Sequence, residues 1–126
     1  MTEQRSAPVY LNLFRIRFPV GAVTSIAHRI TGVLLFVSFP LLVYLLDLSL
    51  AGPDGFAAAV DILGNTWIRL ASALIVWSLA HHLLSGVRFL LLDITEEVSL
   101  KQARRAAWLV NISGLVLVLL YLGWVL

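Results

Sequence analysis

Three histidines and two arginines stand out in this chain because they interrupt strongly apolar stretches. His28 and Arg29 are adjacent in one stretch, and His81, His82 and Arg88 lie in a later one. An imidazole can ligate a metal ion or relay a proton, whereas an arginine can hold a carboxylate or stabilise negative charge. The alternative interpretation is structural: a histidine can simply be hydrogen-bonded to a neighbouring helix, and an arginine can mark the end of a span. The residue types alone leave both interpretations open.

The elements that position these residues follow from the distribution of charge. Three long stretches contain no Asp, Glu, Lys or Arg, and they cover residues 30–46, 70–87 and 106–126. Each approaches or exceeds the roughly 18 apolar residues that are typical of a membrane-spanning helix. The sequence therefore predicts an all-α membrane protein with three transmembrane helices, at approximately 20–47, 67–93 and 105–126. Residues 1–126 would form a single membrane-anchor domain.

The composition excludes several classes of protein. Of the 126 residues, 60% are hydrophobic and 13% are charged, whereas about 25% of residues are charged in soluble domains. Such a chain cannot give a freely soluble enzyme the polar surface that it needs. The absence of cysteine excludes disulfides, cysteine-ligated iron–sulfur clusters and a cysteine nucleophile. A dispersed net charge of +2 gives no basis for nucleic-acid binding.

The segments between and before the spans carry the turn signals and most of the charge. Residues 52–55, Gly-Pro-Asp-Gly, predict a turn between the first two spans, and residues 56–63 could form a short interfacial helix. The connection over residues 95–105 is the most charged part of the chain. Residues 1–18 lack the compact apolar core and cleavage site of a signal peptide, and they are short for a mitochondrial transit peptide. This favours a bacterial protein.

The basic residues are strongly biased toward one side of the predicted spans. Eight of the nine fall on that side, and these are Arg5, Arg15, Arg17, Arg29, Arg88, Lys101, Arg104 and Arg105. Arg69 alone falls on the other side, together with Asp47, Asp54 and Asp61. The positive-inside rule then predicts a cytoplasmic N-terminus and a periplasmic C-terminus, in a multi-pass protein of the bacterial inner membrane.

The depth of the polar residues can be estimated from the helical rise of 1.5 Å per residue. Arg29 lies 18 residues from Asp47, or about 27 Å. Arg69 lies 19 residues from Arg88, or about 28 Å. Both lengths nearly match the roughly 30 Å thickness of the bilayer hydrocarbon. Arg29 and Arg88 are therefore expected near the cytoplasmic interface, and His82 about 9 Å deeper than Arg88.

Helical periodicity sorts the polar residues and glycines of the first two spans into faces. The faces are Ser25–Arg29–Gly32, Gly21–Thr24–His28, His82–Gly86–Phe89–Asp93 and His81–Ser85–Arg88. A glycine one turn from a histidine leaves room for a flat macrocycle, although close helix packing is the commoner use of small residues in membranes. A haem would explain these features, with His82 at the depth of the iron and with His28 and Arg29 one porphyrin radius nearer the cytoplasm. Spacing alone permits a haem without requiring it.

Two blocks of sequence resemble the cytochrome b subunit of bacterial succinate dehydrogenase. The first is Ser-Ile-Ala-His-Arg-Ile-Thr-Gly at residues 25–32, and the second is His-Leu-Leu-Ser-Gly-Val-Arg at residues 82–88, followed by Asp93. Arg-Phe-Pro at residues 17–19 and the segment at residues 8–13 extend the resemblance over nearly the whole chain. One block on each of two successive spans makes the combination specific.

The resemblance implies a role for several of these residues. His82 would be this chain's axial ligand to the iron of one haem b, with His81 as the competing choice. Ser25 and Arg29 would help to form a ubiquinone site at the cytoplasmic edge, and His28 and Arg29 would lie near the haem propionates. Asp93 matches an acidic position close to the quinone site, where it is a possible contributor without an assigned role. The family often has a further histidine where this chain has Phe89, so no propionate contact is expected there.

The resemblance also implies partners. A second hydrophobic anchor subunit would complete the helix bundle and supply the other haem ligand, while a flavoprotein and an iron–sulfur subunit would oxidise succinate. This chain would contain no catalytic residue for that oxidation, and it would pass electrons from the iron–sulfur subunit to ubiquinone. The nearest rival function is that of a fumarate reductase anchor that uses menaquinone. The residues also permit a small transporter with His82 and Asp93 as a proton relay, or a purely structural anchor.

Overall fold

The computed structural model describes residues 16–95 and 97–126, and this part of the chain contains four α-helices and no strand. The helices are α1 (Val20–Leu50), α2 (Pro53–Gly64), α3 (Thr66–Ile94) and α4 (Leu100–Val125). Three of them, α1, α3 and α4, are long and apolar enough to cross a membrane. The prediction of an all-α protein with three transmembrane helices is confirmed. The segment at residues 8–13, together with Arg5 and Arg15, lies outside the described residues.

The helix boundaries have local causes in the sequence. Gly52 separates α1 from α2 with a φ of 109°, a conformation that favours glycine, and Pro53 begins α2. The side chain of Asn65 caps α3 by accepting a hydrogen bond from the backbone N–H of Trp67 at 2.9 Å. Ser99 and Gln102 form a reciprocal capping box at the start of α4. The turn predicted at residues 52–55 therefore contains the end of the α1–α2 connection and the first residues of α2.

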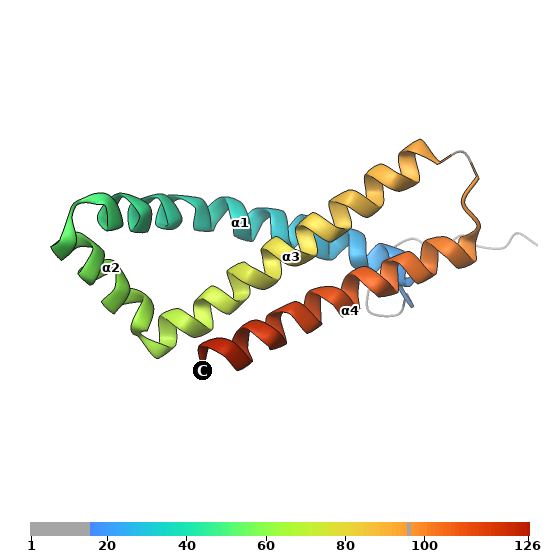
Figure 1. Cartoon of the computed structure of the whole chain (residues 1–126). Coiled ribbons are helices and arrows are strands. Elements are labelled where there is room, and N and C mark those ends of the chain that lie inside the picture. Colours follow the sequence, from blue (N-terminus) through green and yellow to red (C-terminus); the bar gives the residue numbers. More distant parts are fainter. Residues whose placement is uncertain (1–15, 96) are drawn as a thin grey trace, which may run out of the picture.

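The helices form an open arrangement in which α3 is central (Figure 1). The helix α4 runs antiparallel beside α3, and α1 crosses α3 near its own N-terminal end (Figure 1). The short helix α2 joins the far ends of α1 and α3, where these two helices are well separated (Figure 1). The three long helices therefore come together only at the end of the bundle that contains the N-terminal turn of α1.

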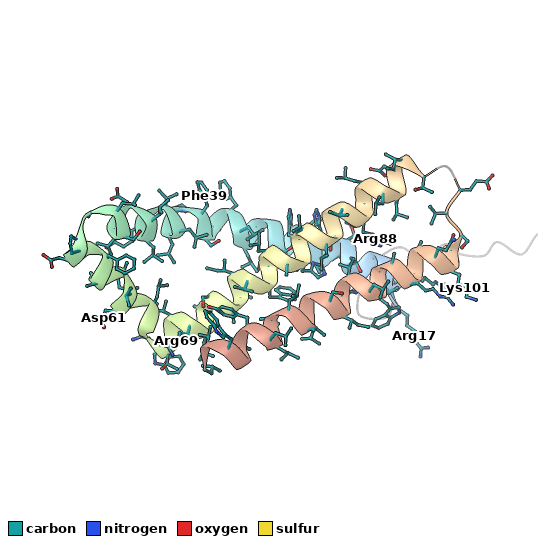
Figure 2. The ribbon with its side chains drawn as sticks, viewed as in Figure 1. Arg17, Phe39, Asp61, Arg69, Arg88 and Lys101 are labelled. Carbon is teal, nitrogen blue, oxygen red and sulfur yellow. The ribbon has the colours of Figure 1, made fainter. Side chains whose placement is uncertain are left out.

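The interior of this bundle is made of small and polar side chains. Thr24, Ser78 and Ser85 are completely buried, and Ala107 and Gly114 are buried on α4. Small residues let membrane helices approach closely. The large apolar side chains point outward instead. Phe39, for example, lies on the outer side of α1 (Figure 2) and has 65% of its surface exposed. This is the pattern of a chain whose surroundings are lipid or other membrane subunits, and it leaves the interior to polar groups.

Candidate functional site

The crossing of α1 and α3 brings two of the three histidines into contact. The imidazole rings of His28 and His82 stack with their centroids 4.0 Å apart and their planes at 9°. Nδ1 of His82 lies 3.0 Å from the backbone carbonyl oxygen of His28 and 3.3 Å from Oγ1 of Thr31. A carbonyl oxygen only accepts hydrogen bonds, so Nδ1 of His82 carries the proton and donates it. In the neutral ring, Nε2 therefore keeps its lone pair.

Two glycines make this contact possible. A Cβ atom on Gly32 would lie 3.0 Å from Cε1 of His82, and a Cβ atom on Gly86 would lie 3.6 Å from Nε2 of His28. Each glycine thus faces the imidazole of the opposite helix. Each glycine lets a histidine ring approach the backbone of the opposite helix, which is the close-packing use of small residues in membranes.

The third histidine, His81, has a different environment. Only 2% of its surface is exposed, and its Nε2 lies 3.0 Å from Oδ1 of Asn111 on α4. Since an amide oxygen accepts, Nε2 of His81 donates, and Nδ1 can accept from the hydroxyl of Ser85 at 3.3 Å. Thr24 of α1 donates to the same Asn111 oxygen at 3.2 Å. Both nitrogens of His81 are therefore occupied by a network that joins all three long helices.

The relative depth of His28 and His82 differs from the sequence-based estimate. That estimate separates them by a porphyrin radius, whereas their rings are 4.0 Å apart. The estimate treated the two helices as parallel, whereas α1 and α3 cross at an angle (Figure 1). The number of residues along each helix therefore does not give the relative depth of two residues on different helices. His28 consequently lies beside His82 and packs edge-on against the ring of Phe89, with centroids 5.4 Å apart.

The residues expected at the quinone site lie near one another on α1. Arg29 is exposed and lines a shallow hollow of about 280 Å³ together with Ile30, Val33 and Leu34, all from the same helix. Ser25, one turn earlier, is half-buried, and Asp93 is exposed in the last turn of α3. A hollow bounded by one helix cannot enclose a ligand, so any binding site at Arg29 needs walls from another molecule.

Arg88 does not behave as a simple marker of the end of a span. Its side chain is 92% buried, since 8% of its surface is exposed. One guanidinium nitrogen donates to the backbone carbonyl of Ala103 on α4 at 3.1 Å, and the guanidinium carbon lies 5.3 Å from the centre of the Phe89 ring. The side chain thus reaches across to α4 instead of extending toward water, as a snorkelling arginine would.

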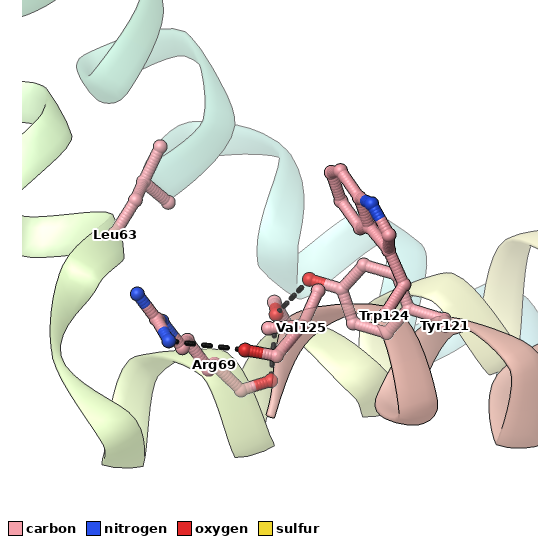
Figure 3. Close-up of a pocket in the computed structure, with 6 residues that line it drawn as sticks. Leu63, Arg69, Tyr121, Trp124 and Val125 are labelled. Atoms are coloured by element: carbon pink, nitrogen blue, oxygen red, sulfur yellow. Dashed lines mark hydrogen bonds between the residues drawn. The ribbon is translucent and has the colours of Figure 1, made fainter.

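A separate hollow of about 390 Å³ lies at the opposite end of the bundle (Figure 3). Arg69 donates to the backbone carbonyl of Val125 at 3.0 Å, and the hydroxyls of Ser72 and Tyr121 are 2.6 Å apart. A cation near the last carbonyls of a helix is stabilised by the helix dipole. These contacts connect α3 to the end of α4, and the residues that line this hollow include no histidine and no acid.

Within residues 16–95 and 97–126, no three His, Cys, Asp or Glu side chains gather where they could hold a metal ion. Sequence reasoning missed Asn111, the amide partner of His81, although an asparagine inside an uncharged span was a visible signal. It also missed the role of Thr31, which lies within the first of the two motif blocks.

Comparison with known proteins shows what these motifs belong to. The succinate dehydrogenase/fumarate reductase transmembrane subunit family matches residues 1–125. The chain belongs to this family. It is 34% identical to the succinate dehydrogenase cytochrome b556 subunit of Coxiella burnetii, over 94% of this chain and 95% of that protein. It is 32% identical to the subunit of the same name from Paracoccus denitrificans, over 91% of this chain and 88% of that protein.

A third relative, from Rickettsia prowazekii, has the same name and is 31% identical, over 94% of this chain and 90% of that protein. The resemblance inferred from the two motif blocks is therefore confirmed. As a member of this family with three apolar helices, the chain is a multi-pass protein of the bacterial inner membrane and a membrane subunit of a respiratory enzyme complex.

Proposed function

We propose that this chain binds one haem b through Nε2 of His82 and passes electrons from an iron–sulfur subunit to ubiquinone. The observation that carries the proposal is the hydrogen bonding of His82. Its Nδ1 is engaged by the carbonyl of His28, whereas its Nε2 forms no hydrogen bond within the described part of the chain. The names of the three relatives, each a cytochrome b556 subunit of succinate dehydrogenase, support the same assignment.

The donor set fits a haem iron. Metal-ligating histidines usually donate their second ring N–H to a carbonyl or carboxylate, which fixes the tautomer and the ring orientation. The carbonyl of His28 has this role toward His82, and the hydroxyl of Thr31 supports it from the same side. His81 fits less well, because an iron would have to displace one of its two partners. The other hydrophobic anchor subunit would supply the second protein ligand to the iron.

The bound haem would supply a one-electron carrier within the membrane. The chain's own residues would orient it. The stack of His28 on His82 holds the ligating ring in place, and Arg29 offers a cation for a propionate one residue further along α1. Phe89 packs against His28 where a histidine is common in the family, so it shields that side of the stack without offering a hydrogen bond.

The quinone site is proposed at Ser25 and Arg29, and the partner subunits complete it. A serine hydroxyl can donate to a quinone carbonyl, and the arginine cation stabilises the negative charge that develops as electrons arrive. The shallow, one-sided hollow at Arg29 agrees with a site shared between subunits. Asp93, in the last turn of α3, is a further candidate with no assigned step.

The other partners follow from the proposed function. Because the chain lacks cysteine, iron–sulfur clusters and succinate oxidation belong to an iron–sulfur subunit and a flavoprotein on the cytoplasmic side. We place the N-terminus in the cytoplasm and the C-terminus in the periplasm. The family name also covers fumarate reductase, so the assay that separates the two directions is the rate of each reaction with ubiquinone and with menaquinone.

The test is a reduced-minus-oxidised absorption spectrum of the complex assembled with its partner subunits. The wild-type complex and a His81→Ala variant should show a low-spin haem b, and a His82→Ala variant should lose that signature or show a shifted one. Assembly is checked by the subunit ratio of the purified complex. A normal spectrum for His82→Ala, with loss of the signal in an assembled His81→Ala complex, would contradict the proposal.

A further inference from the structure

Arg88 is a buried arginine with no acidic partner among the described residues. Arg88 is 92% buried, and its described contacts are a carbonyl of α4 and the face of the Phe89 ring. Its Nε atom is buried and has no hydrogen-bond partner among the described residues. Removing a cation from water costs several kcal/mol unless an anion or several hydrogen bonds replace the water. The guanidinium therefore has capacity for an anionic partner.

A hollow of about 180 Å³ lies next to this guanidinium, and we call it the basic hollow. It is lined by Pro19, Gly21, Arg88, Leu100, Ala103 and Arg104. Arg104 adds a second cation from α4, which is exposed at the rim. The wall formed by α1 is its first turn, where Pro19 provides no side-chain cap and no residue is acidic. The positive end of the α1 dipole thus faces the same space as two arginines.

Arg88 also borders a second hollow, of about 280 Å³, between α3 and α4. We call it the apolar hollow, because its lining is apolar apart from Arg88 and Thr95. The apolar lining residues are Leu84, Val87, Leu91, Leu92, Val98, Ala106, Leu109 and Val110. The two helices separate here as they approach the connection between them (Figure 1). The basic hollow and the apolar hollow therefore meet at the side chain of Arg88.

We propose that these two hollows bind an anionic phospholipid. Its phosphate occupies the basic hollow, between Arg88, Arg104 and the first turn of α1, and an acyl chain occupies the apolar hollow. Basic pockets between transmembrane helices on the cytoplasmic side are suited to acidic lipid head groups. Arg17 and Lys101 lie at the same end of the bundle (Figure 2), so the site is at the membrane surface where such head groups occur.

This site is separate from the proposed haem site. Arg88 shares a helix face with His81 and Ser85, which are both buried against α4, whereas His82 points from a neighbouring face toward α1. The phosphate site is therefore expected to stay occupied when the haem ligand is removed, and a variant of the site should retain a normal haem spectrum. Failure of one proposal would leave the other intact.

The experiment is native mass spectrometry of the purified complex, with bound phospholipid counted for matched variants. Arg104→Gln removes the exposed cation at the rim, and Arg105→Gln is the control, because Arg105 is exposed, adjacent in sequence and lines neither hollow. Loss of one charge-assisted contact should reduce the bound anionic lipid about tenfold in Arg104→Gln and leave it unchanged in Arg105→Gln. Equal retention in the two variants would overturn the proposal.

A second arm separates a lipid from a free anion. The delipidated complex is placed in phosphatidylcholine nanodiscs, with either phosphatidylglycerol or inorganic phosphate added. Phosphatidylglycerol should raise the melting temperature of the wild-type complex and of Arg105→Gln, but not of Arg104→Gln. Inorganic phosphate should have little effect, because it cannot fill the apolar hollow. A rise of the same size with phosphate alone would overturn the assignment to a lipid.

Discussion

The substitution Gly32→Ala tests the geometry of the histidine stack. The added Cβ would lie 3.0 Å from Cε1 and 3.4 Å from Nδ1 of His82, whereas carbon atoms in good contact are about 3.5–4.0 Å apart. The imidazole would have to move by a few tenths of an ångström. His28 is stacked on the ring, and its carbonyl accepts from Nδ1, so this movement disturbs the contact that orients His82. Overpacking of this kind costs about 1–3 kcal/mol, partly offset by about 1 kcal/mol from the better helix propensity of alanine.

The chain offers a matched control for this prediction. In Gly86→Ala the new Cβ would be 3.6 Å from His28, an ordinary contact, so that variant should keep the helix-propensity gain without overpacking. The measurements are the haem spectrum and the melting temperature of the assembled complex. We expect a perturbed spectrum and a lower melting temperature for Gly32→Ala than for Gly86→Ala. Identical behaviour of the two variants would refute the reasoning.

Three further predictions test the quinone site, the hydrogen-bond network of His81 and the end of the bundle at Arg69. Arg29→Ala should lower the quinone reductase rate more than Ser25→Ala does, in complexes that retain the haem, because it removes a charge and not a neutral hydrogen bond; equal rates would count against the proposed quinone site. Asn111→Leu leaves the buried N–H of His81 unpaired, which should destabilise the bundle by about 1–3 kcal/mol, seen as a lower melting temperature with the haem spectrum retained. Arg69→Ala should cost about 0.5–1.5 kcal/mol by releasing the end of α4, without changing the spectrum; a changed spectrum would show that this end of the bundle is coupled to the haem.

The long helices were predictable because the bilayer imposes a strong constraint on sequence. A span needs about 20 predominantly apolar residues, and the three uncharged stretches have no other simple explanation. Helical periodicity also grouped His81, Ser85 and Arg88 on one face, and the structure buries all three. Period and hydropathy are local properties, so they could be read directly from the chain.

The contacts between helices were not predictable in the same way. The stack of His28 on His82 depends on the angle at which α1 crosses α3. That angle cannot be derived from either sequence block. The partner of His81 was missed because Asn111 lies in a span without charged residues or histidines. Only the packing of α4 on α3 brings His81 and Asn111 together. The burial of Arg88 has the same cause, since depth along the helix predicted its level but not the approach of α4.

The most direct test of haem ligation by His82 is an experimental structure of the complex with its partner subunits, at a resolution that shows the axial ligands. We predict that Nε2 of His82 is bonded to the haem iron while Nδ1 donates to the carbonyl of His28. An iron ligated by His81 or His28, or an Nε2 of His82 that is bonded only to protein with no macrocycle beside it, would contradict this prediction.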